Sequence, residues 1–474
     1  MTDSSLLSHI SNRAKERVLV SFGGAPIPET VSKHPSPISL AGGRPHAEFF
    51  PIHKLQLEII DEPFSNKLKH NVNEVVKFND QTLDLSTGLQ YGPTEGHEQV
   101  LSFAKELINK TNQPGYDDWD LIFTNGTGDS LHKVFNLLIN PGDVVLVESY
   151  TYVPVVANIV NYGGIVVSAK LDFNKKGIDV EWLSDLLDNW GNSEYSHLSK
   201  PKALYTIPTG QNPTGLSIKN EDRSKIYKLA QKHDFIIIED DPYGYIQLGK
   251  YTDGETNQFD NTDEYSLEKY IEDDLPNSFI QFDTEGRVLR LESFSKVFAP
   301  GTRLGFIVGL KNFIKHISRH TLVSTRASSG VSQILLNSVL EHVGGVEGWL
   351  KWNIKISKEY TKRKNLLLKT LFDSDAFTKG QFEVIEPEAG MFIIINVNFP
   401  ENEDGDYREP LEQLRYKTLE NGVLVVLGKN MAFEEEYSKQ AKFLRLTIAT
   451  QDSDGEIIEG ANRLTKAISE YFTR

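Results

Sequence analysis

The sequence lacks cysteine, and it lacks any long hydrophobic run. The absence of cysteine excludes disulfides, thiolate metal sites and cysteine nucleophiles, and it fits a reducing compartment. No apolar run approaches the roughly 20 residues that a membrane-spanning helix needs. Residues 1–22 contain no apolar core followed by small residues that a signal peptidase would cleave. These absences predict a cytoplasmic protein with no membrane contact.

Positive charge is also scarce. The chain has 50 lysines and arginines against 66 acidic residues, which gives a net charge of −16. Such a balance disfavours nucleic acid and anionic lipid as partners. The 474 residues are 39% hydrophobic, enough for a sizeable core divided among two or more units.

Short apolar runs recur through the middle of the chain. Most lack polar alternation, which is typical of strands buried on both faces. Helical patterns at 130–139 and 222–233 separate some of them, so we predict an α/β fold with a seven-stranded, mostly parallel sheet between helices. The seven runs are 121–123, 144–147, 165–167, 203–206, 235–238, 288–291 and 304–308.

The pattern changes after residue 335. Long helices are expected over 332–371, followed by strands at 391–396, 423–427 and 443–448. We therefore predict an N-terminal arm and part of a small domain at 1–75, a large domain at 76–335 and a smaller α+β domain at 336–474. The acidic stretch 251–283 has few aliphatic residues and is interpreted as a surface insertion between two strands.

The most informative segment is Ser293-Phe294-Ser295-Lys296, with Arg303 seven residues beyond the lysine. It combines a lysine nucleophile with hydroxyls and a guanidinium that can hold a phosphate. Pyridoxal phosphate chemistry requires this combination.

Polar residues follow two other predicted strands. Asp240 could keep a pyridine nitrogen protonated, because an opposite charge favours the charged form. Asn212 and Tyr243 could reach an oxygen on the same ring. Helix capping or turn chemistry explains Asp240 and Asn212 equally well when each is taken alone. An ATPase strand would need an earlier G-x-x-x-x-G-K-[ST] loop, which the sequence lacks.

Two further strand ends offer phosphate and ring contacts. Thr127 and Gly128 stand in a glycine-rich turn before a helix, where backbone N–H groups can bind an anion. Tyr152 follows another strand and could stack on a cofactor ring, although a core tyrosine is the alternative. Together, these signals place cofactor contacts after five strands of one sheet.

This constellation resembles the fold-type I pyridoxal phosphate aminotransferases of class I/II. It is most similar to the fungal aromatic-amino-acid and 2-aminoadipate aminotransferases, relatives of kynurenine aminotransferase. The similarity covers almost the whole chain, and its motifs lie at 40–45, 89–93, 205–215, 239–243, 293–305, 422–426 and 445.

The resemblance implies a role for each candidate residue. Lys296 would bond to the cofactor and move the proton, Asp240 would pair with the ring nitrogen, and Tyr152 would stack on the ring. Asn212 and Tyr243 would bind the ring hydroxyl, and Arg445 the substrate carboxylate. The implied phosphate ligands are Thr127, Gly128, Ser293, Ser295, Arg303 and, from the partner subunit of a homodimer, Tyr91.

Two positions depart from the family pattern. The phosphate turn reads Gly126-Thr127-Gly128-Asp129-Ser130, where relatives often have Gly-Ser-Gln or Gly-Asn-Thr. Arg44 stands where relatives carry leucine, next to Gly43 of the implied substrate site. Arg44 could bind the distal carboxylate of glutamate or 2-aminoadipate. An arginine turned to solvent is the alternative.

The implied reaction moves the amino group of phenylalanine, tyrosine or tryptophan, and also of 2-aminoadipate or kynurenine, to 2-oxoglutarate by a ping-pong mechanism. A transaminase of lysine biosynthesis that prefers 2-aminoadipate and a β-lyase on the same fold remain alternatives. A ligand-sensing regulatory module is disfavoured, because only about 35 residues precede the fold and the charge is acidic. No metal is expected.

Overall fold

The computed structural model describes residues 6–19, 28, 30–32, 34–38, 40–64, 72–79, 82–253, 259, 265–402 and 404–473. Within these residues, no helix has both the length and the apolar character needed to cross a membrane.

A seven-stranded sheet forms the core of the large unit, and each strand matches one predicted run. Its residues are almost all buried, because helices cover it. Strand β11 runs antiparallel to its neighbours β10 and β3, and every other neighbouring pair is parallel. The order is β3 (Trp119–Thr124), β11 (Gly305–Leu310), β10 (Val288–Ser293), β9 (Ile236–Asp240), β8 (Pro201–Thr206), β4 (Val144–Glu148) and β5 (Ile165–Ala169).

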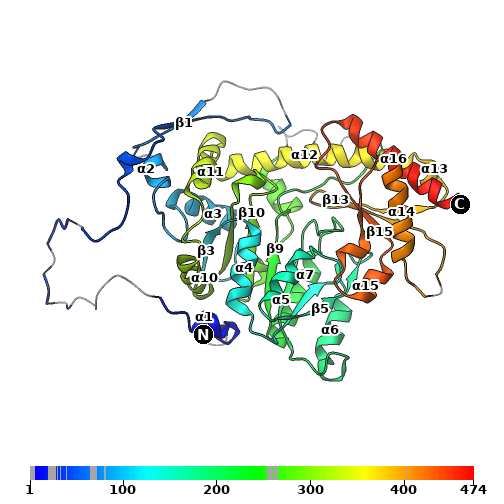
Figure 1. Cartoon of the computed structure of the whole chain (residues 1–474), viewed down its shortest axis with the longest axis horizontal. Helices are drawn as coiled ribbons and strands as arrows, with labels where there is room; N and C mark the ends of the chain where they lie inside the picture. Colours follow the sequence, from blue (N-terminus) through cyan, green and yellow to red (C-terminus); the bar gives the residue numbers. More distant parts are fainter. Residues whose placement is uncertain are drawn as a thin grey trace.

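Two groups of helices pack around this sheet (Figure 1). Helices α4 and α7 confirm the two predicted helical patterns. The first group is α4 (Thr127–Leu138), α5 (Pro154–Asn161) and α10 (Lys311–Val323), and the second is α6 (Val180–Asp188), α7 (Asn220–His233) and α9 (Phe279–Phe282). Other elements of the first half of the chain are α1 (Asn12–Lys15), β1 (Lys54–Glu58), β2 (Val72–Val76), α2 (Leu85–Gly88), α3 (Glu98–Thr111), β6 (Leu171–Asp172) and β7 (Gly177–Ile178).

The C-terminal part builds a second, antiparallel sheet. The expected strand at 423–427 is shortened to two residues, whereas the other two predicted strands are nearly complete. The sheet order is β12 (Phe382–Ile385), β13 (Phe392–Val397), β15 (Phe443–Thr447) and β14 (Val426–Leu427). Its helices are α13 (Asp375–Thr378), α14 (Arg408–Glu420), α15 (Glu435–Gln440) and α16 (Asp454–Phe472).

The helical stretch predicted over 332–371 consists of two helices, α11 (Gly330–Val343) and α12 (Gly345–Phe372). The break lies at Gly344 and Gly345, whose φ angles are 90° and 70°. Glycine adopts this left-handed conformation without steric cost, so it ends one helix and lets the next begin in a new direction. Helix α12 packs on α3 and α11 at one end and on α13 and α16 at the other.

The interpretation of 251–283 as a surface insertion is wrong for its second half, although the segment does lie between β9 and β10. After α8 (Leu267–Lys269), Tyr270 begins a single wide helical turn and is fully buried. Its hydroxyl donates to the carbonyl of Tyr245 at 2.6 Å. Phe279 and Ile280 of α9 are also buried. Average composition conceals this anchoring, because a few well-placed large side chains suffice. Residues 254–258 and 260–264 lie outside the described part.

The described residues between 28 and 53 form no helix or strand apart from a short helical turn at Ala47–Phe49, and this arm extends away from the body of the chain (Figure 1). Several of its apolar side chains are exposed. Ile38, Leu40 and Phe49 are 90%, 96% and 80% exposed. Apolar side chains gathered on an extended arm are typical of a surface that another molecule covers.

Burial of Tyr270 can be tested by substitution. Tyr270→Ala should lower the free energy of unfolding by about 3–5 kcal/mol, because it leaves a cavity in the core. Tyr270→Phe should cost about 1 kcal/mol, since only the hydrogen bond is lost. Glu272→Ala, at an exposed position of the same segment, should change stability by less than about 0.5 kcal/mol. Denaturant unfolding measures all three, and equal small effects would contradict the assignment.

Candidate active site

The candidate residues converge at one edge of the large sheet. Parallel strands place their carboxyl ends at the same edge, where α/β proteins bind ligands. Asp240 ends β9 and lies opposite Leu291 of β10, while Lys296 follows the end of β10 by three residues. The loop that contains Asn212 follows β8, the neighbour of β9 on the other side.

Asp240 is buried, and its two oxygens differ. Oδ2 accepts a hydrogen bond from the Tyr205 hydroxyl at 2.6 Å, whereas Oδ1 is buried with no hydrogen-bond partner among the described residues. Burial raises the pKa of Asp240 to about 7, the Tyr205 hydrogen bond opposes this, and Asp241 adds to it. A buried acceptor without a donor fits the protonated ring nitrogen of pyridoxal phosphate.

Arg290 occupies the other face of β9. Its guanidinium pairs with Glu239 at 3.0 Å, with Asp241 at 2.8 Å and with Glu292 at 2.7 Å, and all of these side chains are buried. Successive residues of a strand point to opposite faces, so the carboxylates flanking Asp240 turn away from it. This ion-pair cluster fixes the strand end on which Asp240 lies.

Lys296 is half-buried in a turn after β10. Burial lowers the pKa of its amine, and the nearby guanidinium groups of Arg303 and Arg445 lower it further. A lower pKa raises the fraction of neutral amine, the form that attacks carbonyl carbon.

A set of anion-binding groups surrounds the start of α4. Gly126, with φ of 85°, precedes this helix, and the Arg303 guanidinium occupies the space that a side chain at Gly126 would need. Arg303 also donates to the Ser295 hydroxyl at 3.4 Å, and the Ser295 amide donates to the Ser293 hydroxyl at 3.1 Å. Thr127 and Gly128 open the helix, so their N–H groups have no partner within it. The structure thus brings together all five predicted phosphate ligands of this chain.

Asp129 explains how the altered glycine turn tolerates an acid. Its Oδ2 accepts from the Asn125 amide at 2.9 Å, and its Oδ1 pairs with Lys133 one turn later. Lys133 is only 1% exposed. The acid therefore stabilises the turn and is neutralised, which leaves the helix start favourable to an anion. In the sequence, the i, i+4 spacing of Asp129 and Lys133 indicates that the two side chains can form this ion pair.

Arg445 approaches from the second sheet. Its Nη1 donates to Asn212 Oδ1 at 2.8 Å, and its guanidinium lies 4.2 Å from the centre of the Phe392 ring. Tyr243 is buried, and burial together with Asp240 raises the pKa of its hydroxyl. Tyr152 is near enough to add to that shift and is 44% exposed, so it borders the open side of the site.

Three predicted residues are not brought into this cluster. Tyr91 is 59% exposed, and Gly43 and Arg44 are exposed in the N-terminal arm. Within the described residues, no hydrogen bond or ion pair joins any of them to the cluster. Gln90 donates to the Pro45 carbonyl at 2.9 Å, which ties the Tyr91 segment to the arm.

Sequence reasoning missed Tyr205 and Glu148 as parts of the site. Glu148 ends β4 and is buried, and burial raises its pKa to about 7. It accepts from the Thr206 hydroxyl at 2.6 Å and from Gln211 Nε2 at 3.1 Å. Because Gln211 precedes Asn212, this carboxyl holds the loop in place. Glu148 follows an apolar run just as Asp240 does, and that signal was available in the sequence.

Comparisons with known proteins agree with this geometry. The family model for aminotransferase class I and II matches residues 53–464. The chain is 40% identical to aromatic amino acid aminotransferase 2 of Saccharomyces cerevisiae, over 98% of this chain and 95% of that protein. It is 30% identical to the mitochondrial kynurenine/alpha-aminoadipate aminotransferase of Mus musculus, over 93% and 94%. The crystal structure of the aromatic aminotransferase Aro9 from Candida albicans has a TM-score of 0.92 and 41% identity, covering 99% of both chains.

The raised pKa of Asp240 has a consequence for stability. Between about pH 4 and pH 7 the folded chain holds a proton that the unfolded chain releases, so this carboxyl makes stability fall as pH rises. Asp240→Asn removes that loss. In the cofactor-free protein, the variant should exceed wild type by about 2–4 kcal/mol in free energy of unfolding near pH 8, and match it near pH 4.

Denaturant unfolding at both pH values measures the effect. Asp273→Asn, at an exposed position, is the matched control and should leave both values unchanged. The same gain at both pH values would contradict the assignment.

Proposed function

Because the chain belongs to the class I and II aminotransferases, we propose that it transfers the amino group of aromatic amino acids to 2-oxoglutarate. The family uses pyridoxal phosphate, and the enzyme is a transaminase. The observation that carries the proposal is that Lys296 lies near Arg303 and Arg445, at the same sheet edge as the partnerless oxygen of Asp240. Phenylalanine, tyrosine and tryptophan are the proposed donors, supported by the names of the similar fungal enzymes.

The cofactor would lie across the strand ends. Asp240 would bind the ring nitrogen, Asn212 and Tyr243 the ring hydroxyl, and Tyr152 one ring face. The phosphate would be held by Thr127, Gly128, Ser293, Ser295 and Arg303. When bound, pyridoxal phosphate supplies an electron sink for negative charge at the substrate Cα.

Lys296 is the proposed proton carrier. Its amine would take the proton from the substrate Cα and return one later, which is general acid–base catalysis. The lowered pKa favours the neutral amine, the form that would react with the cofactor as a nucleophile.

Arg445 is proposed to hold the substrate α-carboxylate. Two parallel N–H···O bonds from a guanidinium fix a carboxylate in orientation as well as position. Asn212 already orients this guanidinium. Amino acid and 2-oxo acid share the α-carboxylate, so one arginine would serve both half-reactions, and ping-pong kinetics follow.

A second candidate function is transamination that prefers 2-aminoadipate, as in lysine biosynthesis, with kynurenine as a further donor. It is supported by the 30% identity to the mouse kynurenine/alpha-aminoadipate enzyme and by an arginine at position 44. Arg44 would have to reach the site from the arm. The similarity to enzymes named for aromatic amino acids is greater, so we place the aromatic donors first.

A donor panel tests the proposed function. The purified protein should be fastest with phenylalanine, tyrosine or tryptophan, and turnover should require 2-oxoglutarate because only a transaminase needs an acceptor. Lys296→Ala should abolish turnover. Arg44→Leu should lower kcat/KM for 2-aminoadipate at least about tenfold more than for phenylalanine, the effect of losing a charged hydrogen bond. Steady turnover without acceptor would indicate a lyase, and equal effects of Arg44→Leu would remove its proposed role.

We also propose a homodimer that shares its active sites. The exposed apolar side chains of the arm and the exposed Tyr91 support it, since a partner subunit would cover them. Tyr91 would then contact the phosphate in the partner's site. The cytoplasm stays our proposed location, and the mitochondrial relative makes that organelle the alternative.

Complementation between inactive variants tests the shared site. Lys296→Ala and Tyr91→Ala are mixed under conditions that exchange subunits. Each mixed dimer then contains one site with both native residues, so activity should recover to about a quarter of wild type. Each variant incubated alone is the control. No recovery, with mixed dimers verified by mass spectrometry, would show that Tyr91 does not act across the interface.

A further inference from the structure

The turn that carries Lys296 has one apolar face, formed by Phe294 and Phe298. Phe298 and Ala299 donate their amides to the Phe294 carbonyl at 2.9 and 3.2 Å, which closes one turn of helix. Residues four apart lie on the same side of such a turn, so Phe294 and Phe298 share a face. Lys296 lies midway between them in sequence and therefore points to the opposite side.

Helix α12 contacts this turn through two tryptophans. Trp349 contacts the rings of Phe294 and Phe298, with centroids 5.8 and 6.4 Å apart. Trp352, three residues later and thus on the same side of α12, donates its indole N–H to the Val297 carbonyl at 3.1 Å. The carbonyl directly after Lys296 is therefore fixed by a side chain that lies outside the active site.

The same helix also holds the strand that carries Arg445. Arg363 donates its Nε to the Ile448 carbonyl at 2.8 Å and its Nη2 to the Gln451 carbonyl. Ile448 follows Arg445 by three residues, just beyond the end of β15. Arg363 follows Trp352 by eleven positions, so the two attachments lie about 16 Å apart along the helix axis.

We propose that α12 sets the separation between Lys296 and Arg445, with Trp352 and Arg363 as the positioning residues at its two attachments. The inference rests on the proposed function, because it assigns the lysine to chemistry and the arginine to substrate carboxylate. A proton transfer and a carboxylate contact on one small substrate require a fixed distance between the two groups. A hydrogen-bonded helix supplies this distance better than the two separate loops could.

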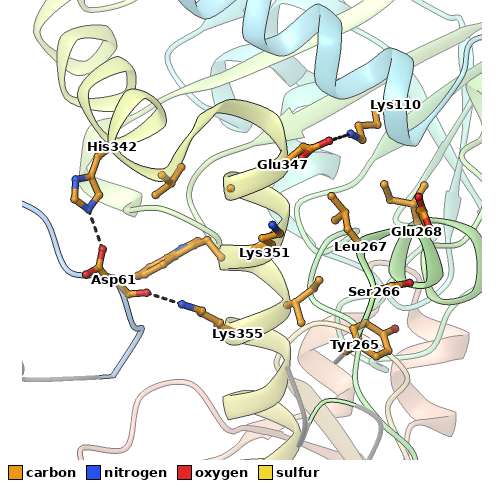
Figure 2. A pocket seen from close by; sticks show the side chains of 15 residues that line it. Asp61, Lys110, Tyr265, Ser266, Leu267, Glu268, His342, Glu347, Lys351 and Lys355 are labelled. Carbon is orange, nitrogen blue, oxygen red and sulfur yellow. Dashed lines mark hydrogen bonds and ion pairs between the residues drawn. The ribbon is translucent and has the colours of Figure 1, made fainter. Parts of the chain in front are cut away.

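The surroundings of Trp352 allow a smaller side chain at this position without a new cavity in the core. The indole is half-buried, and it lines a cavity of about 850 Å³ between α12, α8 and Asp61. Figure 2 shows Lys351 on α12, with Leu267 and Glu268 across from it. Phenylalanine at position 352 would therefore enlarge an existing space rather than create a void in the core. Trp349 is 1% exposed and lacks this property.

Two variants should separate the two attachments. Trp352→Phe removes the hydrogen bond to Val297 and should lower kcat with phenylalanine about three- to tenfold, with KM unchanged. Arg363→Lys keeps the charge but cannot bind both carbonyls, and it should raise KM about three- to tenfold with little change in kcat. Lys351→Ala, on the same helix and in the same cavity, should change neither constant.

Hydrogen–deuterium exchange of the cofactor-free protein gives a readout independent of activity. Peptides covering 293–300 should exchange faster in Trp352→Phe than in wild type, while those covering 443–448 should not. In the wild type, the amides of Phe298 and Ala299 should exchange as slowly as those of α12. Fast wild-type exchange there, or a Trp352→Phe protein with unchanged kcat and exchange, would overturn the proposal. A wild type inactive on every donor would instead refute the proposed function.

Discussion

A carboxylate buried with one oxygen unpaired is energetically costly, and the site is organised around that cost. Asp240 lies at the end of a central strand, where neighbours on both sides exclude water. Tyr205 satisfies one oxygen, and Arg290 neutralises the acids on the reverse face of the strand. The remaining oxygen has no hydrogen-bond partner among the described residues, and a cationic ring nitrogen would supply one. The burial of Asp240 between the central strands therefore favours binding of a cationic hydrogen-bond donor.

The parallel sheet explains why much of the candidate site could be predicted from the sequence. Strand ends converge on one edge, so any polar residue that directly follows an apolar run is a candidate. Asp240, Asn212 and the Lys296 segment were predicted on this basis and do converge. The same rule applies to Glu148, which ends β4 after an apolar run. Tyr205 was not predictable in this way, because its partner depends on which strands become neighbours.

Two other sequence predictions differ from the structure, and in both cases contacts between distant parts of the chain are the reason. The acidic stretch after β9 contains few apolar residues, but Tyr270 and Phe279 are enough to anchor it once a core is present. Local composition cannot indicate that the Tyr245 carbonyl will lie within hydrogen-bond distance of the Tyr270 hydroxyl. Strand β14 is short because only Val426 and Leu427 pair with β15, although the whole run 423–427 is apolar. Pairing, rather than hydrophobicity, sets the length of an edge strand.

The two guanidinium groups near Lys296 would make the pKa of its amine depend on which anions are bound in the site. Burial lowers the pKa of the lysine most, and Arg303 and Arg445 lower it further, which favours the neutral, nucleophilic amine. A phosphate on Arg303 and a carboxylate on Arg445 would each cancel one of these positive charges. The pKa of Lys296 would then rise, because the opposing field is weaker. In the proposed reaction, the amine would therefore be a stronger base when substrate is bound, which is when it would take a proton from Cα.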